Sequence, residues 1–209
     1  MFSGGKLINI GVLASTKATD MQAVIDAIEA KKLDAKISVL ISNKKDAYCL
    51  ERAKKNNIKA VFIDGKGKER EQFDKEVAKV LDENKVQLIL LIGYMRYLSK
   101  WFVSKYKNKI MNIHPSLLPA FAGGMDLNVH EEILKHGCKV TGCTLHFVDE
   151  GQDTGPIIAQ KAIPVLESDN ADTLKEKVQK LEQECIIEGI KKFAKGKLKV
   201  EGRIVKVLD

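Results

Sequence analysis

Three polar side chains with complementary chemistry stand at the expected ends of strands. Asn112 and His114 are two residues apart on an extended segment, so they project to the same side while Ile113 faces the other. Asp153 lies in a later Asp-Thr-Gly-Pro turn. An amide, an imidazole and a carboxylate are sufficient for acyl transfer to an amine, because two groups can donate toward the developing oxyanion while the carboxylate orients the imidazole. Each residue alone is better explained as a strand cap or turn residue, but their grouping beside a Pro-Ser-Leu-Leu-Pro run favours a site.

The elements that must position these residues alternate regularly in the first half of the chain. Apolar runs at 6–13, 36–42, 60–63 and 86–93 are typical of strands, and apolar residues at helical spacing follow at 21–28, 47–56 and 70–83. Strands that alternate with helices predict a parallel sheet covered on both faces. Ligands of such sheets bind at the carboxyl ends of the strands.

After residue 99 the pattern changes. We expect strands at 106–113, 140–148 and 156–165, helices at 127–135 and 169–192, and a hairpin or tail at 197–207. The predicted fold class is α/β, with an open, mostly parallel Rossmann-like sheet, helices on both faces and an antiparallel element in the C-terminal half. We expect a single domain, residues 1–209, made of a nucleotide-binding-like half (1–99) with a phosphate loop and a catalytic half (100–209).

Composition excludes several classes of protein. The 209 residues are 44% hydrophobic, and their four cysteines form no Cys-x-x-Cys pair. No charged and apolar leader opens the chain, so we expect a reduced, cytoplasmic protein without membrane contact. The net charge of +7 comes from lysines spread over the whole length, which favours a solvated surface over a nucleic-acid interface. His136 and His146 lack metal-ligand spacing, so we expect no metal.

Arginine is rare in this chain. The four arginines among its 35 basic residues are Arg52, Arg70, Arg96 and Arg203. Because lysine is used almost wherever a positive charge suffices, these arginines are candidates for positions that need a planar, forked donor.

Three ordered blocks carry a resemblance to a known family. They are residues 92–99 (IGYMRYLS), 111–119 (MNIHPSLLP) and 145–158 (LHFVDEGQDTGPII). In this order and spacing they resemble the folate-dependent formyltransferases, most closely the branch that formylates glycinamide ribonucleotide in purine biosynthesis, and the likeness runs from Leu7 to about Phe193. The resemblance implies transfer of a formyl group from 10-formyltetrahydrofolate to the amine of N1-(5-phosphoribosyl)glycinamide, by direct attack and a tetrahedral intermediate.

The resemblance also implies roles for the residues. His114 is the general acid, Asn112 donates to the formyl oxygen, and Asp153 positions His114, also through a proton-relaying water. We expect activity to be limited on the acidic side by His114 or Asp153. The second half of the chain would hold the folate, whose carboxylate meets Arg70. The expected cosubstrate contacts are Arg70, Met95, Arg96, Tyr97, Leu98, Asn112, Asp149, Glu150, Gly151 and Gln152.

The amine substrate is expected where the first helix begins, with backbone N–H groups facing its phosphate. The family's loop carries glycines, whereas residues 15–20 read Ser-Thr-Lys-Ala-Thr-Asp, which resist positive φ. Asp20 is unfavourable beside a phosphate unless its carboxylate caps the helix. By the resemblance, the substrate contacts are Ala18, Thr19, Asp20, Gln179, Lys180, Leu181 and Glu182.

Several alternatives remain open. A sugar-nucleotide N-formyltransferase is one, because the phosphate loop is atypical. A formyltetrahydrofolate hydrolase or a methionyl-tRNA formyltransferase would normally carry a further domain, for which we expect no room. A folate- or nucleotide-binding module without turnover is disfavoured by the complete catalytic trio. Gly123-Gly124 would form either a gate or an ordinary flexible loop, and we expect a monomer or homodimer.

Overall fold

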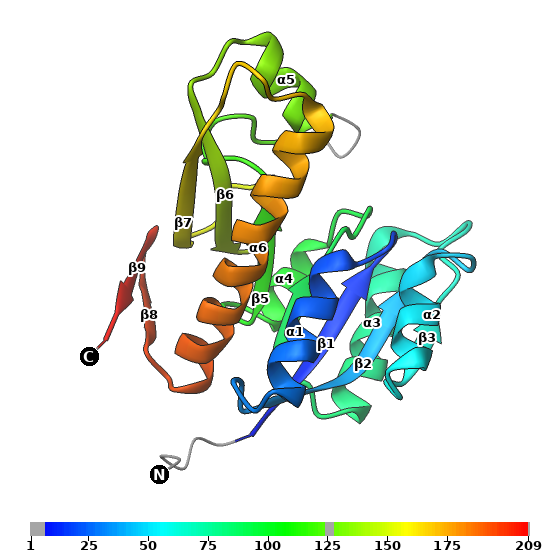
Figure 1. Ribbon diagram of the computed structural model, residues 1–209. Coiled ribbons are helices and arrows are strands. Elements are labelled where there is room, and N and C mark those ends of the chain that lie inside the picture. Colours follow the sequence, from blue (N-terminus) through cyan, green and yellow to red (C-terminus); the bar gives the residue numbers. More distant parts are fainter. Residues whose placement is uncertain (1–6, 124–127, 209) are drawn as a thin grey trace.

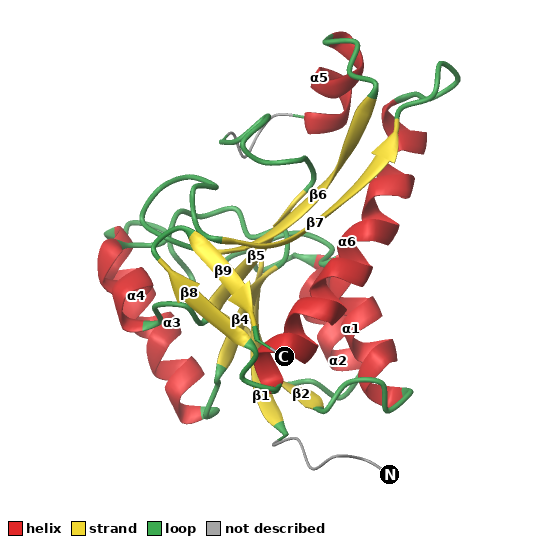
Figure 2. Cartoon of the chain, turned by 90° about the vertical axis from the view of Figure 1, so that its left-hand side faces the viewer, coloured by secondary structure: helices red, strands yellow, loops and turns green. Residues whose placement is uncertain are grey.

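The computed structural model describes residues 7–123 and 128–208. In this part of the chain, nine strands form one sheet in the order β3-β2-β1-β4-β5-β6-β7-β9-β8, with helices packed against it (Figures 1 and 2). The strands are β1 (Ile8–Ala14), β2 (Ala35–Ser42), β3 (Ala60–Phe62), β4 (Leu88–Leu91), β5 (Ile110–His114), β6 (Val140–Phe147), β7 (Ile157–Pro164), β8 (Leu198–Glu201) and β9 (Ile204–Val207). The helices are α1 (Thr19–Glu29), α2 (Tyr48–Lys55), α3 (Arg70–Glu83), α4 (Lys100–Lys105), α5 (Val129–Lys135) and α6 (Ala171–Ala194).

The sheet changes from parallel to antiparallel beyond β5. Strands β1 to β5 pair in parallel. β6 joins β5 in the antiparallel direction, with His146 opposite Asn112, and β7 continues the antiparallel pairing. β9 lies parallel to β7 and forms the terminal hairpin with β8. The predicted mostly parallel α/β sheet with an antiparallel C-terminal element is therefore confirmed.

Helices cover both faces of the sheet. In Figure 2, α3 and α4 lie on one side, and α1, α2 and α6 lie on the other. The α3 and α4 side buries Phe73 and Phe102 completely, and the opposite side buries Met21 and Cys185 completely. β1 and β4 lie between these two apolar layers, which explains why their sequences are almost continuously apolar.

The long helix α6 follows its expected apolar stripe. Leu174, Val178 and Cys185 are fully buried, and the helix begins with a capping box in which Asn170 accepts from the Thr173 backbone N–H at 2.9 Å. Gly189 faces β6 so closely that an added Cβ would lie 2.2 Å from Leu145 Cδ2. The helix therefore packs directly against the strand that carries His146.

The expected strand at 106–113 is too long at its N-terminal end. β5 begins only at Ile110, and the preceding residues end the short helix α4, which was not expected. Ser99 caps α4 by accepting from Phe102 N–H at 3.2 Å. The Tyr106 hydroxyl donates to Asp82 on α3 at 2.7 Å, and Asn108 turns the chain with φ 57°. Tertiary contacts with α3 therefore decide the conformation of this segment.

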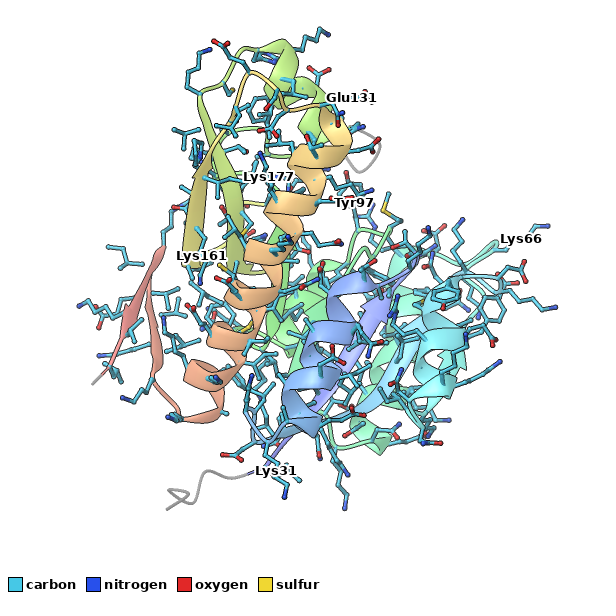
Figure 3. All side chains as sticks on the ribbon, viewed as in Figure 1. Lys31, Lys66, Tyr97, Glu131, Lys161 and Lys177 are labelled. Atoms are coloured by element: carbon cyan, nitrogen blue, oxygen red, sulfur yellow. The ribbon has the colours of Figure 1, made fainter. Side chains whose placement is uncertain are left out.

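Basic side chains are distributed over the molecule. Figure 3 shows Lys31, Lys66 and Lys161 at widely separated positions. Lys161 bridges Glu184 and Glu188, each at 2.7 Å. None of the described helices has the length and apolar character needed to cross a membrane.

Candidate active site

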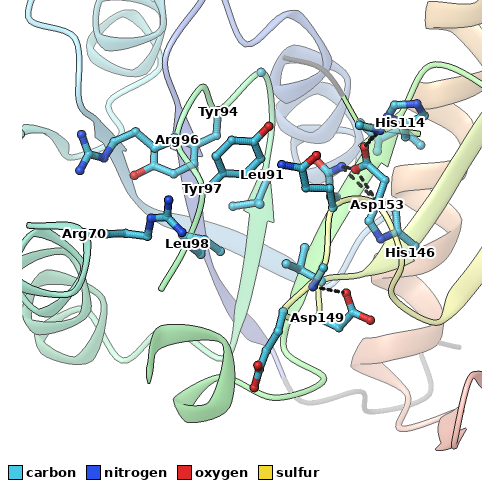
Figure 4. A pocket seen from close by; sticks show the side chains of 18 residues that line it. Arg70, Leu91, Tyr94, Arg96, Tyr97, Leu98, His114, His146, Asp149 and Asp153 are labelled. Carbon is cyan, nitrogen blue, oxygen red and sulfur yellow. Dashed lines mark hydrogen bonds and ion pairs between the residues drawn. The ribbon is translucent and has the colours of Figure 1, made fainter. Parts of the chain in front are cut away.

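A cavity of about 430 Å³ opens where β4, β5 and the β6–β7 loop meet. Figure 4 shows Arg70 and Arg96 on one side of it and His114 and Asp153 on the other. This volume falls within the range of small-molecule sites. The lining residues are Arg70, Leu91, Gly93, Tyr94, Arg96, Tyr97, Leu98, Asn112, Ile113, His114, Gly123, His146, Val148, Asp149, Glu150, Gly151, Gln152 and Asp153.

The structure brings the three predicted catalytic residues together. His114 Nδ1 lies 3.4 Å from Asp153 Oδ2, and the Asn112 amide donates to Asp153 Oδ1 at 3.4 Å (Figure 4). β5 carries Asn112 and His114, whereas the β6–β7 loop carries Asp153 in the left-handed region, with φ 52°. Because β6 runs antiparallel to β5, β6 ends at Phe147 beside Met111, and the β6–β7 loop folds back along β5 so that Asp153 reaches Asn112 and His114.

The hydrogen bonds of His114 fix the position of its proton. Nε2 lies 2.9 Å from the carbonyl oxygen of Phe121, which can only accept, so Nε2 carries the proton of the neutral ring. Nδ1 is then the nitrogen that faces Asp153. Burial lowers the pKa of His114, and this outweighs the raising effects of Asp153 and the Phe121 carbonyl. Before substrate binds, His114 is therefore mostly neutral at neutral pH.

Asp153 is an ionised hydrogen-bond acceptor. Burial raises its pKa, but its polar contacts with His146, His114 and the Gly123 N–H outweigh burial, so the pKa lies below its ordinary value. The Gly123 N–H donates to Oδ2 at 3.0 Å. The negative charge therefore remains beside Nδ1 of His114 throughout the neutral range.

The loop that carries Asp153 is braced from within. Asp149 Oδ1 accepts from Gly151 N–H at 3.1 Å and from the Thr154 hydroxyl at 2.7 Å. Gly155 passes so close to β6 that an added Cβ would lie 1.8 Å from the Phe147 carbonyl oxygen. Only glycine fits at this position, which fixes the path of the loop into β7.

Most of the expected cosubstrate residues line the cavity. The exception is Met95, whose backbone N–H instead donates to Ser15 Oγ at 2.7 Å. The Arg70 guanidinium lies 5.8 Å from the centre of the Tyr97 ring. The cavity members of the expected set are Arg70, Arg96, Tyr97, Leu98, Asn112, Asp149, Glu150, Gly151 and Gln152.

The seven expected amine-substrate contacts lie outside this cavity, at the start of α1 and on α6. Ala18 precedes α1 with φ 45° and ψ 54°, so it adopts the left-handed conformation that the sequence disfavours. The carboxylate of Asp20 does not cap α1; it turns to α6 and accepts from Gln183 at 3.4 Å. The contact with Gln183, and not helix capping, is therefore the interaction that this carboxylate makes.

Two acids meet where α1 packs on α6. Burial raises the pKa of Asp20 to about 6, and burial followed by the charge of Asp20 raises the pKa of Glu182 to about 8. The Glu182 carboxyl makes no hydrogen bond with any described residue, although the residue is buried, with only 9% of its surface exposed. Of its predicted neighbours, Gln179 is half-buried, Lys180 is exposed and Leu181 packs against the core.

The segment after Pro119 closes over the trio as far as it is described. Phe121 and Gly123 supply the carbonyl and the N–H that meet His114 and Asp153. The expected Gly123-Gly124 gate lies partly outside the described residues, because Gly124 is not among them.

Comparison with known proteins places this geometry in a family. Residues 8–190 match the model of the formyl transferase family. The chain belongs to this family. The predicted membership is therefore confirmed.

The relatives of this chain include a short protein and a much longer one. Phosphoribosylglycinamide formyltransferase of Escherichia coli is 37% identical over 92% of this chain and 90% of the relative. The human trifunctional purine biosynthetic protein adenosine-3 is 40% identical over 91% of this chain, and the chain spans about a fifth of that protein's length, since the match covers 19% of it. The crystal structure of glycinamide ribonucleotide transformylase 1 from Symbiobacterium toebii superposes with a TM-score of 0.93, at 41% identity, covering 100% of this chain and 98% of that one.

Sequence reasoning missed His146 in this formyltransferase. Its Nδ1 lies 2.9 Å from the Phe147 carbonyl oxygen, which can only accept, and its Nε2 lies 3.1 Å from the Asn112 amide nitrogen. The ring is 2% exposed. Its place in an apolar strand concealed this role, and only the antiparallel register, which sets His146 opposite Asn112, reveals it.

Tyr94 is a second cavity residue that was not expected. Its hydroxyl is buried and has no hydrogen-bond partner in the described part of the chain. A buried hydroxyl without a partner costs about 1–3 kcal/mol. The formyltransferase cavity therefore offers a polar atom that a ligand can satisfy. No group of side chains suited to a metal ion occurs among residues 7–123 and 128–208.

Proposed function

We propose that this chain transfers the formyl group of 10-formyltetrahydrofolate to the amine of N1-(5-phosphoribosyl)glycinamide, a step of purine biosynthesis. The observation that carries the proposal is the contact of Asn112, His114 and Asp153 at one end of a cavity whose other end holds arginine. Support for the amine comes from the Escherichia coli relative, whose length this chain nearly matches.

The cavity residues fit a formylated folate. Leu91, Leu98 and Val148 supply apolar surface for a ring system. Arg70 supplies a forked cation for a carboxylate. The unpartnered hydroxyl of Tyr94 adds a donor and acceptor for ring heteroatoms.

His114 moves the proton in the proposed reaction. Its neutral ring presents a bare Nδ1, which can take the proton released by the attacking amine. The ionised Asp153 stabilises the imidazolium that results. His114 then acts as the general acid toward the departing nitrogen. The His114 ring is therefore neutral at the start of the reaction and protonated between the two proton transfers.

Asn112 is placed to donate to the formyl oxygen. Its two N–H bonds point to His146 at 3.1 Å and to Asp153 at 3.4 Å. The longer bond is the weaker one. A substrate oxygen bound closer than Asp153 would therefore accept a hydrogen bond from this N–H in place of Asp153. The contact with His146 would keep the amide in position.

The phosphate of the amine substrate would bind at the start of α1. The backbone N–H groups of Ala18, Thr19 and Asp20 have no acceptor among the described residues. The N-terminal end of a helix attracts anions through such N–H groups and through its dipole. Glu182 and Gln179 on α6 would face the sugar beside it.

An absorbance assay of folate deformylation tests the proposal. We expect turnover only when phosphoribosyl glycinamide is present. Turnover without an amine would indicate a hydrolase, and turnover restored only by an amino sugar nucleotide would indicate the sugar-nucleotide alternative. Absence of turnover with every amine would exclude the proposal and favour a binding module.

A further inference from the structure

The loop before α1 adopts an unfavourable backbone conformation without a glycine. Ala18 has φ 45°, in the left-handed region, which an alanine adopts far less readily than glycine. The residue is 2% exposed, and its carbonyl accepts the first hydrogen bond of the helix, from Met21 N–H at 3.1 Å. Contacts elsewhere on this loop must therefore hold it in place.

Those contacts come from α2. The Cys49 N–H donates to the Thr16 carbonyl oxygen at 3.1 Å. The Arg52 Nε–H donates to the Lys17 carbonyl oxygen, also at 3.1 Å, and Nη1 donates to Gln22 Oε1 at 2.8 Å. The Arg52 fork thus joins the loop to the first turns of α1, on either side of Ala18.

Free N–H groups follow the clamped carbonyl groups. The carbonyl oxygens of Thr16 and Lys17 accept from α2, and the N–H groups of Ala18, Thr19 and Asp20 have no acceptor in the described structure, as is usual for the first N–H groups of a helix. The unpartnered, buried Glu182 of α6 lies within electrostatic reach of Asp20 at the same end of α1. Two independent features, free N–H groups and a buried acid without a hydrogen-bond partner among the described residues, therefore occur near the same end of α1.

We propose that Arg52 is a positioning residue for the phosphate of the amine substrate. It holds Ala18 in the left-handed conformation, which a glycine would adopt without such a contact. In this way it keeps the N–H groups of Ala18, Thr19 and Asp20 directed at the phosphate. This inference rests on the proposed function, which assigns a phosphate to this loop.

The contacts of Arg52 distinguish it from a general surface cation. It forms no ion pair with any described acid within 4 Å. Its guanidinium lies 5.4 Å from the centre of the Tyr48 ring, and Lys55 of the same helix lies 5.5 Å from that ring without reaching the loop. Lys55 is therefore a matched control: it has the same charge, helix and aromatic neighbour but no bond to the loop.

Two measurements on the full chain test the proposal. Isothermal titration calorimetry gives the dissociation constant of ribose 5-phosphate, which needs no turnover, and steady-state kinetics give KM for each substrate. Arg52→Gln should weaken ribose 5-phosphate about tenfold, equivalent to one lost positioning contact of about 1.4 kcal/mol. It should raise KM for the amine similarly, with kcat and KM for the formyl donor within about twofold.

Two further variants separate positioning from charge. Arg52→Lys keeps the charge but lacks the fork, so it should bind ribose 5-phosphate with intermediate affinity. Adding Ala18→Gly to Arg52→Gln should recover at least about threefold of the lost affinity, because glycine adopts the left-handed conformation without the clamp. Lys55→Gln should behave as the unmodified chain does.

The outcomes are distinct. An Arg52→Gln variant that binds ribose 5-phosphate normally would overturn the inference, as would equal losses in Arg52→Gln and Lys55→Gln, or no recovery with Ala18→Gly. A chain that does not bind ribose 5-phosphate at all also overturns it. A chain that binds ribose 5-phosphate through Arg52 but formylates no phosphoribosyl glycinamide would retain the inference and refute the proposed function.

Discussion

Asp153 is the residue on which the catalytic group converges. One carboxylate oxygen faces His114 and the Gly123 N–H, and the other faces Asn112 and His146. An asparagine would keep the shape but lose the charge that stabilises the imidazolium. Asp153→Asn should therefore lower kcat by about 10²–10⁴ while tetrahydrofolate affinity, measured by fluorescence quenching, changes only a few-fold.

Asp153→Asn should also change the protonation of His114. The charge of Asp153 raises the pKa of His114 against the effect of burial. Removing it should move the pKa of His114 still lower, as followed by NMR titration of the ring protons. Asp172→Asn, on the exposed first turn of α6, serves as a control. An unchanged titration of His114 in Asp153→Asn would refute the assigned contact.

His146 should act through Asn112. Phenylalanine at this position fills a similar volume but removes the Nε2 acceptor that holds the amide. We expect His146→Phe to lower kcat about tenfold, with a smaller change in KM for the formyl donor, since the ring contacts the amide rather than the ligand. Equal losses in kcat and in thermal stability would instead indicate a packing role.

The limits of sequence reasoning are visible at these residues. The two-residue spacing of Asn112 and His114 was sufficient to place both side chains in one cavity, because alternation along a strand is a local property. His146 depends on strand register, and the backbone of Ala18 depends on contacts from α2, which lie more than thirty residues away. Neither is a local property, so neither could be read from spacing.

At the scale of elements, the contact between α1 and α6 controls a pH-dependent part of stability. The Glu182 carboxyl has a pKa of about 8 in the folded chain, above its ordinary value of 4.5. The folded state therefore holds a proton that the unfolded state releases. The stability from this proton is complete below pH 4.5 and falls as pH rises toward 8.

Glu182→Gln removes this dependence. Relative to the unmodified chain, the variant's free energy of unfolding, from urea denaturation, should rise between pH 5 and pH 8 and level off above pH 8. Glu176→Gln, on an exposed turn of the same helix, should show no such trend. A constant difference across this range would mean that Glu182 is ionised in the folded chain.

Element boundaries also show what periodicity can and cannot predict. The helix at 70–83 agrees with its apolar spacing to the residue, because one face packs on the sheet along its whole length. The segment from Lys100 to Asn108 has aromatic residues that suit a strand or a helix equally. Its conformation follows from the Ser99 cap and the Tyr106 contact with α3, which only the assembled fold provides.

At the scale of the whole molecule, the halves 1–99 and 100–209 are joined through one sheet and one buried apolar cluster. β4 and β5 pair across the boundary, with Leu90 opposite Met111. Leu90, Met111 and Cys185 belong to the same buried cluster, and α1 from the first half packs on α6 from the second. The cavity likewise takes Arg70 from one half and His114 from the other.

This sharing predicts that the chain unfolds as one unit. Trp101, the single tryptophan, lies in the second half, and Cys49 lies fully buried in the first. In a guanidinium titration, unfolding can be followed by Trp101 fluorescence and by alkylation of Cys49, located by mass spectrometry. Both signals should have the same midpoint, because separation of the two halves would expose the apolar cluster to which both halves contribute residues. Alkylation of Cys49 at denaturant concentrations where Trp101 is still native would show that the first half opens alone, and the two halves would then be separate folding units.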